Sequence, residues 1–219
     1  MQRIAENIRQ IESELPQSTQ LVVVSKYREI HEIQAAYDAG QRIFAENRVQ
    51  ALLERVEALP QDIEWHLIGH LQSNKVKYIA PFIAMIHSVD SLELLKEINK
   101  QAAKHHRVIR CLVQLHVAQE ESKFGLAISE LPNFFEGWKS GEFAHVQLVG
   151  LMAMASLTED ESQISKEFAL VQQSFNEVKQ TYFPSDDHFN EISIGMSSDY
   201  KIAIEHGSTM VRIGSAVFA

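Results

Sequence analysis

The chain has 219 residues, of which 45% are hydrophobic and 22% are charged, a composition typical of a folded globular protein. Its formal net charge of −9 and its scattered basic residues argue against nucleic acid or an anionic membrane surface as a partner. The single cysteine, Cys111, has no intramolecular partner, and no apolar stretch has the length of a signal peptide or a membrane span, so we expect a cytoplasmic protein.

Hydrophobic periodicity predicts an amphipathic helix first and then alternating strands and helices. Apolar residues recur at helical spacing in residues 2–15, before Pro16. The predicted strands are 21–26, 42–47, 63–69, 82–90, 107–117, 146–154, 188–195 and 209–218. The predicted helices between them are 30–40, 49–59, 72–80, 91–106, 128–138, 160–182 and 197–207.

Eight strands separated by seven helices, with no Gly/Ser/Pro linker, indicate one domain over residues 1–219. The pattern favours an α/β fold of the closed parallel (β/α)8 type, a TIM barrel. Since no helix is predicted after the eighth strand, the N-terminal helix is expected to complete the helical ring. A doubly wound open sheet is the alternative, but no Gly-rich dinucleotide fingerprint follows the first strand.

In such a barrel the C-terminal ends of the strands meet at one mouth, where active sites lie. Lys26 follows the apolar run LVVVS of the first strand. Partial burial there would disfavour the charged ammonium and leave a nucleophilic amine, able to form a Schiff base with a carbonyl group. A solvated lysine in a strand-to-helix turn is the alternative.

Two Gly/Ser-containing turns follow the seventh and eighth predicted strands and indicate a phosphate site. Ser197 and Ser198 are expected where a helix begins, Gly214 allows close backbone approach, and Arg212 points to the same end. The alternative is that a serine caps its helix and Gly214 only turns the chain. A phosphate site facing a reactive lysine is the outline of a pyridoxal phosphate (PLP) site.

The other strand ends carry further residues that could line the same mouth. They are Glu46, Asn47, Gly69, His70, His87, Asp90, His116, Met152, Met154 and Gly195. His66 and His70 are four residues apart across a strand and its exit loop, which does not favour a metal site. Gln72, Asn74 and Lys75 are equally consistent with a helix start, a ligand contact or a solvated surface.

Motifs in nearly every part of the chain resemble those of the pyridoxal phosphate homeostasis family. They are VVVSK, FAENRVQ, WHLIGHLQSNK, KFGL, GLMAM, ISIGMSSDY and AIEHGSTMVRIGSAVF. Ala45 and Leu67 are the conservative departures. The resemblance implies a fold-type III PLP barrel similar to the N-terminal domain of alanine racemase, with Lys26 forming the Schiff base. It further implies that Ser197, Gly214 and Ser215 hold the phosphate, that Arg212 faces the pyridine nitrogen, and that Asn47 and Met152 line the site.

The chemistry of Arg212 bears on whether this is an enzyme. An arginine stays cationic and disfavours a protonated pyridine nitrogen, so the ring is a weak sink for carbanion charge. The first hypothesis is therefore a monomeric protein without turnover that buffers PLP or delivers it to PLP-dependent apo-enzymes. The alternative is a small racemase or related amino-acid enzyme with Lys26 as one base. A barrel that binds another phosphorylated ligand is a third interpretation.

Overall fold

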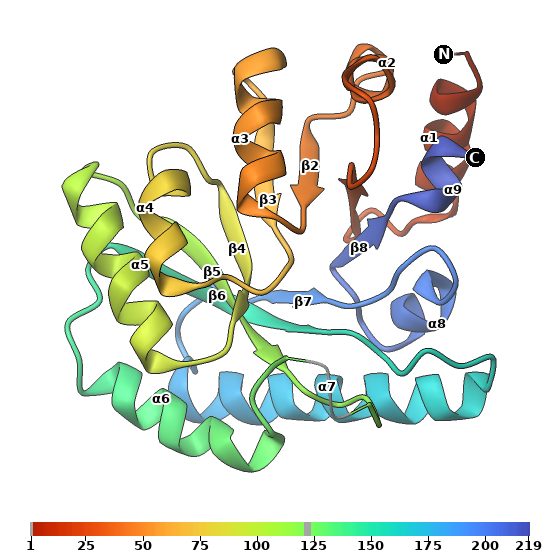
Figure 1. Ribbon diagram of the computed structural model, residues 1–219. Coiled ribbons are helices and arrows are strands. Elements are labelled where there is room, and N and C mark those ends of the chain that lie inside the picture. The colour runs from red at the N-terminus through yellow and green to blue at the C-terminus, as the bar shows by residue number, and fades with distance from the viewer. Residues whose placement is uncertain (1, 121–123) are drawn as a thin grey trace.

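The computed structural model describes residues 2–120 and 124–219 and shows a closed barrel of eight parallel strands (Figure 1). Each strand pairs with the next along the chain, and β1 pairs with β8. The barrel predicted from the sequence is therefore confirmed, whereas the single-domain assignment stays a prediction. The strands are β1 (Gln20–Val24), β2 (Ile43–Glu46), β3 (Glu64–Leu67), β4 (Met85–Val89), β5 (Ile109–Leu115), β6 (Val146–Ala153), β7 (Glu191–Ser193) and β8 (Met210–Ile213).

Helices surround the barrel and, apart from the last one, lie where the sequence predicts helices. Ser91 caps α5 by accepting a hydrogen bond from the Leu94 amide, and Asp160 caps α7. The α-helices are α1 (Gln2–Glu14), α2 (Ile30–Asp38), α3 (Val49–Ala58), α4 (Val76–Ile79), α5 (Leu92–Lys104), α6 (Leu131–Lys139), α7 (Glu161–Tyr182), α8 (Tyr200–Glu205) and α9 (Ser215–Phe218). Two 3-10 turns, η1 (Ser73–Lys75) and η2 (Ile128–Glu130), precede α4 and α6. No helix of the described ranges is long and apolar enough to cross a membrane.

The prediction of a strand over residues 209–218 is wrong in its second half. β8 ends at Ile213, Gly214 departs from strand geometry, and Ser215–Phe218 forms the short helix α9. Periodicity cannot distinguish a strand from a helix in so short an apolar run. The helix α1 lies beside α9 and α2, as Figure 1 shows, and the Asn7 side chain donates to the Val217 carbonyl at 3.0 Å. The N-terminal helix therefore completes the ring together with α9.

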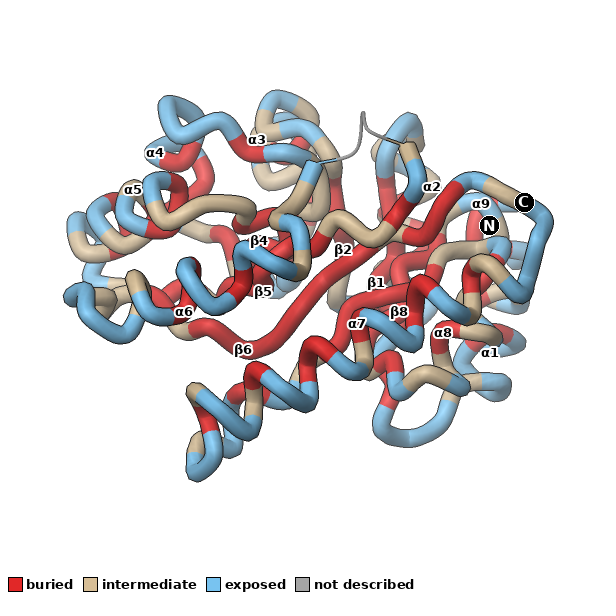
Figure 2. The backbone as a smooth tube through the Cα atoms, turned by 90° about the horizontal axis from the view of Figure 1, so that it is seen from below, coloured by how far each residue is buried: buried red, intermediate tan, exposed pale blue. Residues whose placement is uncertain are grey.

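Two apolar cores hold the barrel together, and the strands are buried on both faces (Figure 2). The larger core lies between strands and helices and includes Val23, Phe44 and Ile213. The smaller core fills the barrel interior with Val22, Val24, Ala45, Met85, Leu112, Val149, Met152 and Met210. Since alternate strand residues face opposite sides, the polar residues His66, His87, Ser193 and Arg212 lie at interior positions of β3, β4, β7 and β8.

Candidate functional site

Lys26 lies at the C-terminal end of β1, two residues after the strand ends at Val24. Ser25 is still fully buried, but the Lys26 side chain is exposed. The partial burial expected of Lys26 is therefore wrong, because the chain leaves the barrel wall directly after Ser25. Lys26 is an accessible primary amine at the barrel mouth.

Buried side chains hold the turn that carries Lys26. The Ser25 hydroxyl donates to Glu46 Oε1 at 2.8 Å, and Glu46 is only 1% exposed. Arg55 places its Nε 3.5 Å from the same carboxylate oxygen and donates through Nη2 to the Arg28 carbonyl at 2.7 Å. Burial raises the pKa of Glu46, while the Ser25 hydrogen bond and Arg55 act in the opposite direction. Residues 25–28 are thus fixed from α3 and β2.

The residue after the lysine has an unusual backbone. Tyr27 has a φ of 63° and a side chain that is 77% exposed. A left-handed conformation is uncommon for a bulky residue and costs about 1–2 kcal/mol. Strain of this kind persists where the surrounding structure imposes it, and here the held turn around Lys26 does so.

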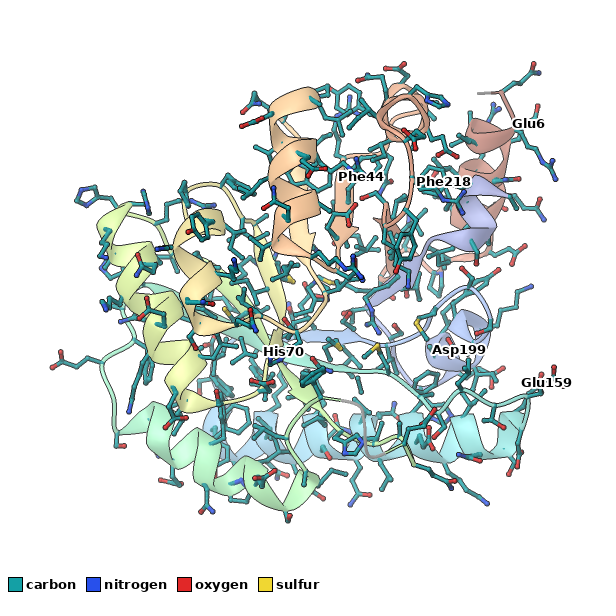
Figure 3. The ribbon with its side chains drawn as sticks, in the orientation of Figure 1. Glu6, Phe44, His70, Glu159, Asp199 and Phe218 are labelled. Carbon is teal, nitrogen blue, oxygen red and sulfur yellow. The ribbon has the colours of Figure 1, made fainter. Side chains whose placement is uncertain are left out.

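The second turn reaches the same mouth from the C-terminal end. A Cβ on Gly214 would lie 3.0 Å from the carbonyl oxygen of Val24, so the start of α9 lies directly against the end of β1. The Arg28 guanidinium lies over the Phe218 ring, 5.0 Å from its centroid, and links the lysine turn to α9. Figure 3 labels Phe218 on this helix. Lys26, Gly214 and Ser215 are thereby brought together.

The serines of the 195–199 turn are placed differently from the prediction. The helix α8 begins at Tyr200, after Ser197 and Ser198, and neither serine caps it. Instead, Ser197 Oγ accepts from the Ala216 amide of α9 at 3.4 Å. Ser197 therefore belongs to the same corner as Gly214 and Ser215, with a hydroxyl and amide groups that can donate to an anion.

Arg212 is 3% exposed and reaches the level at which β6 and β7 end. Its Nη1 donates to the carbonyl oxygen and to the hydroxyl of Ser193, both at 2.7 Å, and its Nη2 donates to the Ala153 carbonyl at 2.9 Å. Burial lowers the pKa of Arg212 to about 10, so the guanidinium stays charged at neutral pH.

A pair of buried histidines continues from Ser193. His87 Nδ1 lies 3.0 Å from Ser193 Oγ, and His87 Nε2 lies 3.0 Å from His66 Nδ1. Burial lowers the pKa of His66 to about 3 and that of His87 well below its usual value, with nearby arginines adding to both effects. Both rings are therefore neutral at physiological pH.

The two remaining predicted site residues lie at other strands of the mouth. Met152 is fully buried in the interior core and pairs in register with Ser193. Asn47 follows β2, and its carbonyl oxygen would lie 2.1 Å from a Cβ on Gly69, so the turns after β2 and β3 are in close contact. A surface pocket of about 440 Å³ is lined by Asn47, Arg48, Val49, Gln50, Leu53, His70, Gln72, Lys75 and Tyr78; Asn74 is exposed elsewhere on η1.

His70, at the end of a predicted strand, and the KFGL motif were also noted in the sequence. His70 is stacked on Phe124 with ring centroids 4.0 Å apart, and its Nδ1 lies 3.3 Å from Asp90 Oδ2. Within residues 2–120 and 124–219, no group of three or more His, Cys, Asp or Glu side chains is arranged to hold a metal ion. Lys123 of the KFGL motif lies outside the described residues.

Three residues of the site were missed in the sequence. Ser193 follows an apolar residue in the short strand EIS, where alternation could have identified it as an interior polar position. Ser25 and Arg55 gave no signal, because their role depends on a carboxylate that only the fold brings to them.

The chain is similar to known proteins over most or all of its length. Residues 1–219 match the family model of the alanine racemase N-terminal domain. The chain is 37% identical to the pyridoxal phosphate homeostasis protein of Aquifex aeolicus over 187 residues, which cover 85% of this chain and 80% of that protein. It is 33% identical to the protein of the same name from Escherichia coli K12, over 100% of this chain and 97% of that one.

Solved structures show the same fold. PipY of Synechococcus elongatus, solved without PLP, superposes with a TM-score of 0.89 at 34% identity, over 99% of this chain and 100% of that one. PipY with PLP bound gives a TM-score of 0.84 over the same coverage. Alanine racemase from E. faecalis shares the fold with a TM-score of 0.71 at 16% identity, and the match covers 99% of this chain and 57% of the racemase.

Proposed function

Since the chain belongs to the alanine racemase N-terminal domain family, and within it to the pyridoxal phosphate homeostasis proteins, we propose that it binds PLP as a Schiff base on Lys26. We further propose that it buffers the cofactor or delivers it to PLP-dependent apo-enzymes in the cytoplasm, as a monomer and without turnover of its own. PipY, which shares 34% of its sequence, has been solved with PLP bound.

The observation that carries the proposal is the approach of α9 to the end of β1. Gly214 contacts Val24, so the phosphate donors of Ser197, Gly214 and Ser215 lie beside the turn of Lys26. An amine near an anion-binding corner fits an aldehyde that carries a phosphate. PLP supplies the aldehyde, which condenses with a lysine amine and releases water.

Charge supports the absence of turnover. Arg212 is buried, cationic and hydrogen-bonded to Ser193 and Ala153. We infer that this fixed positive group faces the pyridine nitrogen of bound PLP. Beside such a group the ring nitrogen stays unprotonated, which weakens the ring as an electron sink. Asn47 and Met152 complete the wall of the proposed site.

A borohydride experiment tests the assignment of the lysine. PLP-loaded protein should show the visible absorbance of a Schiff base, and reduction should fix the cofactor on a single peptide containing Lys26. Lys26→Ala should give no reducible adduct, whereas Lys75→Ala, at an exposed lysine on the same mouth, should behave as the wild type. An adduct that persists in Lys26→Ala would refute the proposal.

Solvent exchange tests the absence of turnover. Loaded protein in deuterated water with L-alanine or L-serine should exchange the Cα proton at a negligible rate. Exchange at a catalytic rate would identify a racemase or a related amino-acid enzyme instead.

A further inference from the structure

A continuous chain of hydrogen bonds crosses the barrel interior beneath the proposed cofactor. It runs from Arg212 on β8 to Ser193 on β7, His87 on β4 and His66 on β3, with distances of 2.7, 3.0 and 3.0 Å. These four side chains are 3%, 0%, 0% and 1% exposed. Buried polar groups of this kind are costly unless each one is satisfied, so their arrangement has to be consistent along the whole chain.

The direction of the chain follows from its first member. A guanidinium only donates, so the Ser193 hydroxyl accepts from Arg212 Nη1. If His87 Nδ1 also donated to this hydroxyl, both lone pairs of the oxygen would be used, and neither Arg212 nor His87 could accept the serine proton. A buried unsatisfied donor costs about 1–3 kcal/mol. The Ser193 hydroxyl therefore donates to an unprotonated His87 Nδ1.

The histidine tautomers follow in turn. The His87 ring is neutral, so with Nδ1 accepting it carries its proton on Nε2 and donates to His66 Nδ1. His66 then also carries its proton on Nε2. In addition to burial, the positive charge of Arg110 acts against protonation of both rings, and that of Arg212 acts against protonation of His87. A second proton on either ring would place two donors face to face, at the contact of His87 with Ser193 or at that of His87 with His66.

We propose that Ser193 and His87 are positioning residues that hold the Arg212 guanidinium in one orientation toward the pyridine nitrogen of PLP, with His66 fixing the tautomer of His87. The role of Arg212 toward PLP rests on the proposed function, whereas the tautomers do not. A hydroxyl that accepts on one side and donates on the other cannot rotate without losing a bond. His87 thus fixes the orientation of the Ser193 hydroxyl, and Ser193 fixes Nη1 of Arg212 through two hydrogen bonds.

Nitrogen NMR on the protein without added PLP tests the tautomers. Ring signals are assigned by comparison with the His87→Asn and His66→Asn variants. We expect both rings to be protonated on Nε2 and to show no titration between about pH 6 and 8. A proton on Nδ1 of His87, or titration of either ring in that range, would overturn the proposed direction.

PLP binding tests the effect on Arg212, with two variants at one position. His87→Asn keeps a carbonyl oxygen able to accept from Ser193, whereas His87→Leu removes the acceptor. The Leu variant should bind PLP about fivefold more weakly and shift the absorbance band of the bound cofactor, since about one hydrogen bond is lost. The Asn variant should stay within about twofold of the wild type.

Three results decide between positioning and a merely structural role. A folded Leu variant with wild-type affinity and absorbance, or an Asn variant as impaired as Leu, would overturn the proposal. Ser193→Ala is the smaller change and decides the question if the Leu variant does not fold, with the same loss and band shift expected. Failure of the wild type to take up PLP would overturn the proposed function and the role of Arg212 but leave the tautomer result valid.

Discussion

Replacing Arg212 with methionine should destabilise the apo-protein, because buried acceptors lose their donor. Burial lowers the pKa of this side chain to about 10 from 12.5, which corresponds to about 3 kcal/mol against the charged form in the folded state. Its three hydrogen bonds to Ser193 and Ala153 return about 1 kcal/mol each. These two contributions nearly cancel, but methionine also leaves the buried acceptors of Ser193 and Ala153 without a donor, at about 1 kcal/mol or more each, so we expect Arg212→Met to lower the free energy of unfolding by about 3 kcal/mol.

Arg212→Lys is the matched control and should lose less stability, because it keeps a donor in the same place. A lysine keeps the charge in the same buried place but lacks the planar fork that bonds Ser193 and Ala153 together. We expect a loss of about 2 kcal/mol in urea unfolding followed by circular dichroism at pH 7.5. A loss below about 1 kcal/mol in Arg212→Met, or a wild-type value in Arg212→Lys, would refute this account of burial and hydrogen bonding.

Three further measurements test the fold. Gly150→Ala should lower the free energy of unfolding by about 3 kcal/mol or more, because the new Cβ would lie 1.8 Å from a β7 carbonyl oxygen at a φ of +157°. Gly40→Ala is the control in the same urea assay: its φ is +109° but no neighbour lies within 4 Å of the Cβ, so the loss should be only about 1 kcal/mol. Tyr27→Gly should gain up to about 1 kcal/mol by relieving a φ of 63°; thermal unfolding that shows a loss would contradict this. His66 and His87 have pKa values near 6.5 in the unfolded chain and far lower values in the folded protein, so the unfolded state gains protons first as the pH falls. Acidification from pH 7.5 to 5.5 should therefore lower the free energy of unfolding by about 3 kcal/mol, and His87→Asn should remove about half of this pH dependence.

The barrel could be predicted from the sequence because its strands and helices differ in period and length. Strands buried on both faces read as apolar runs, as in residues 21–24, and helices such as 161–182 carry polar residues on one face. The segment 215–218 could not be assigned in this way. Four residues are too few for a period, and the helix α9 depends on tertiary packing of Val217 and Phe218.

The sequence allowed candidate site residues to be named, but their environment could not be predicted from it. Lys26, Ser197 and Gly214 could be singled out because strand ends and Gly/Ser turns carry chemistry in such barrels. The exposure of Lys26 could not be predicted, since it depends on the residue at which β1 leaves the wall. The partners of Arg212 likewise depend on the register of β6, β7 and β8, which no local pattern specifies.

The contrast between an exposed Lys26 and a buried Arg212 bears on the proposed carrier role. An amine open to solvent allows water or another amine to reach a Schiff base, and the linkage can then be reversed. The groups proposed to bind the cofactor noncovalently are, by contrast, held by the contact of Gly214 with Val24 and by the interior chain at Arg212. A rigid noncovalent binding site combined with a solvent-accessible Schiff base favours loading and release of the cofactor over its retention. An enzyme that stabilises carbanions benefits from the opposite arrangement, in which the linkage is shielded from water.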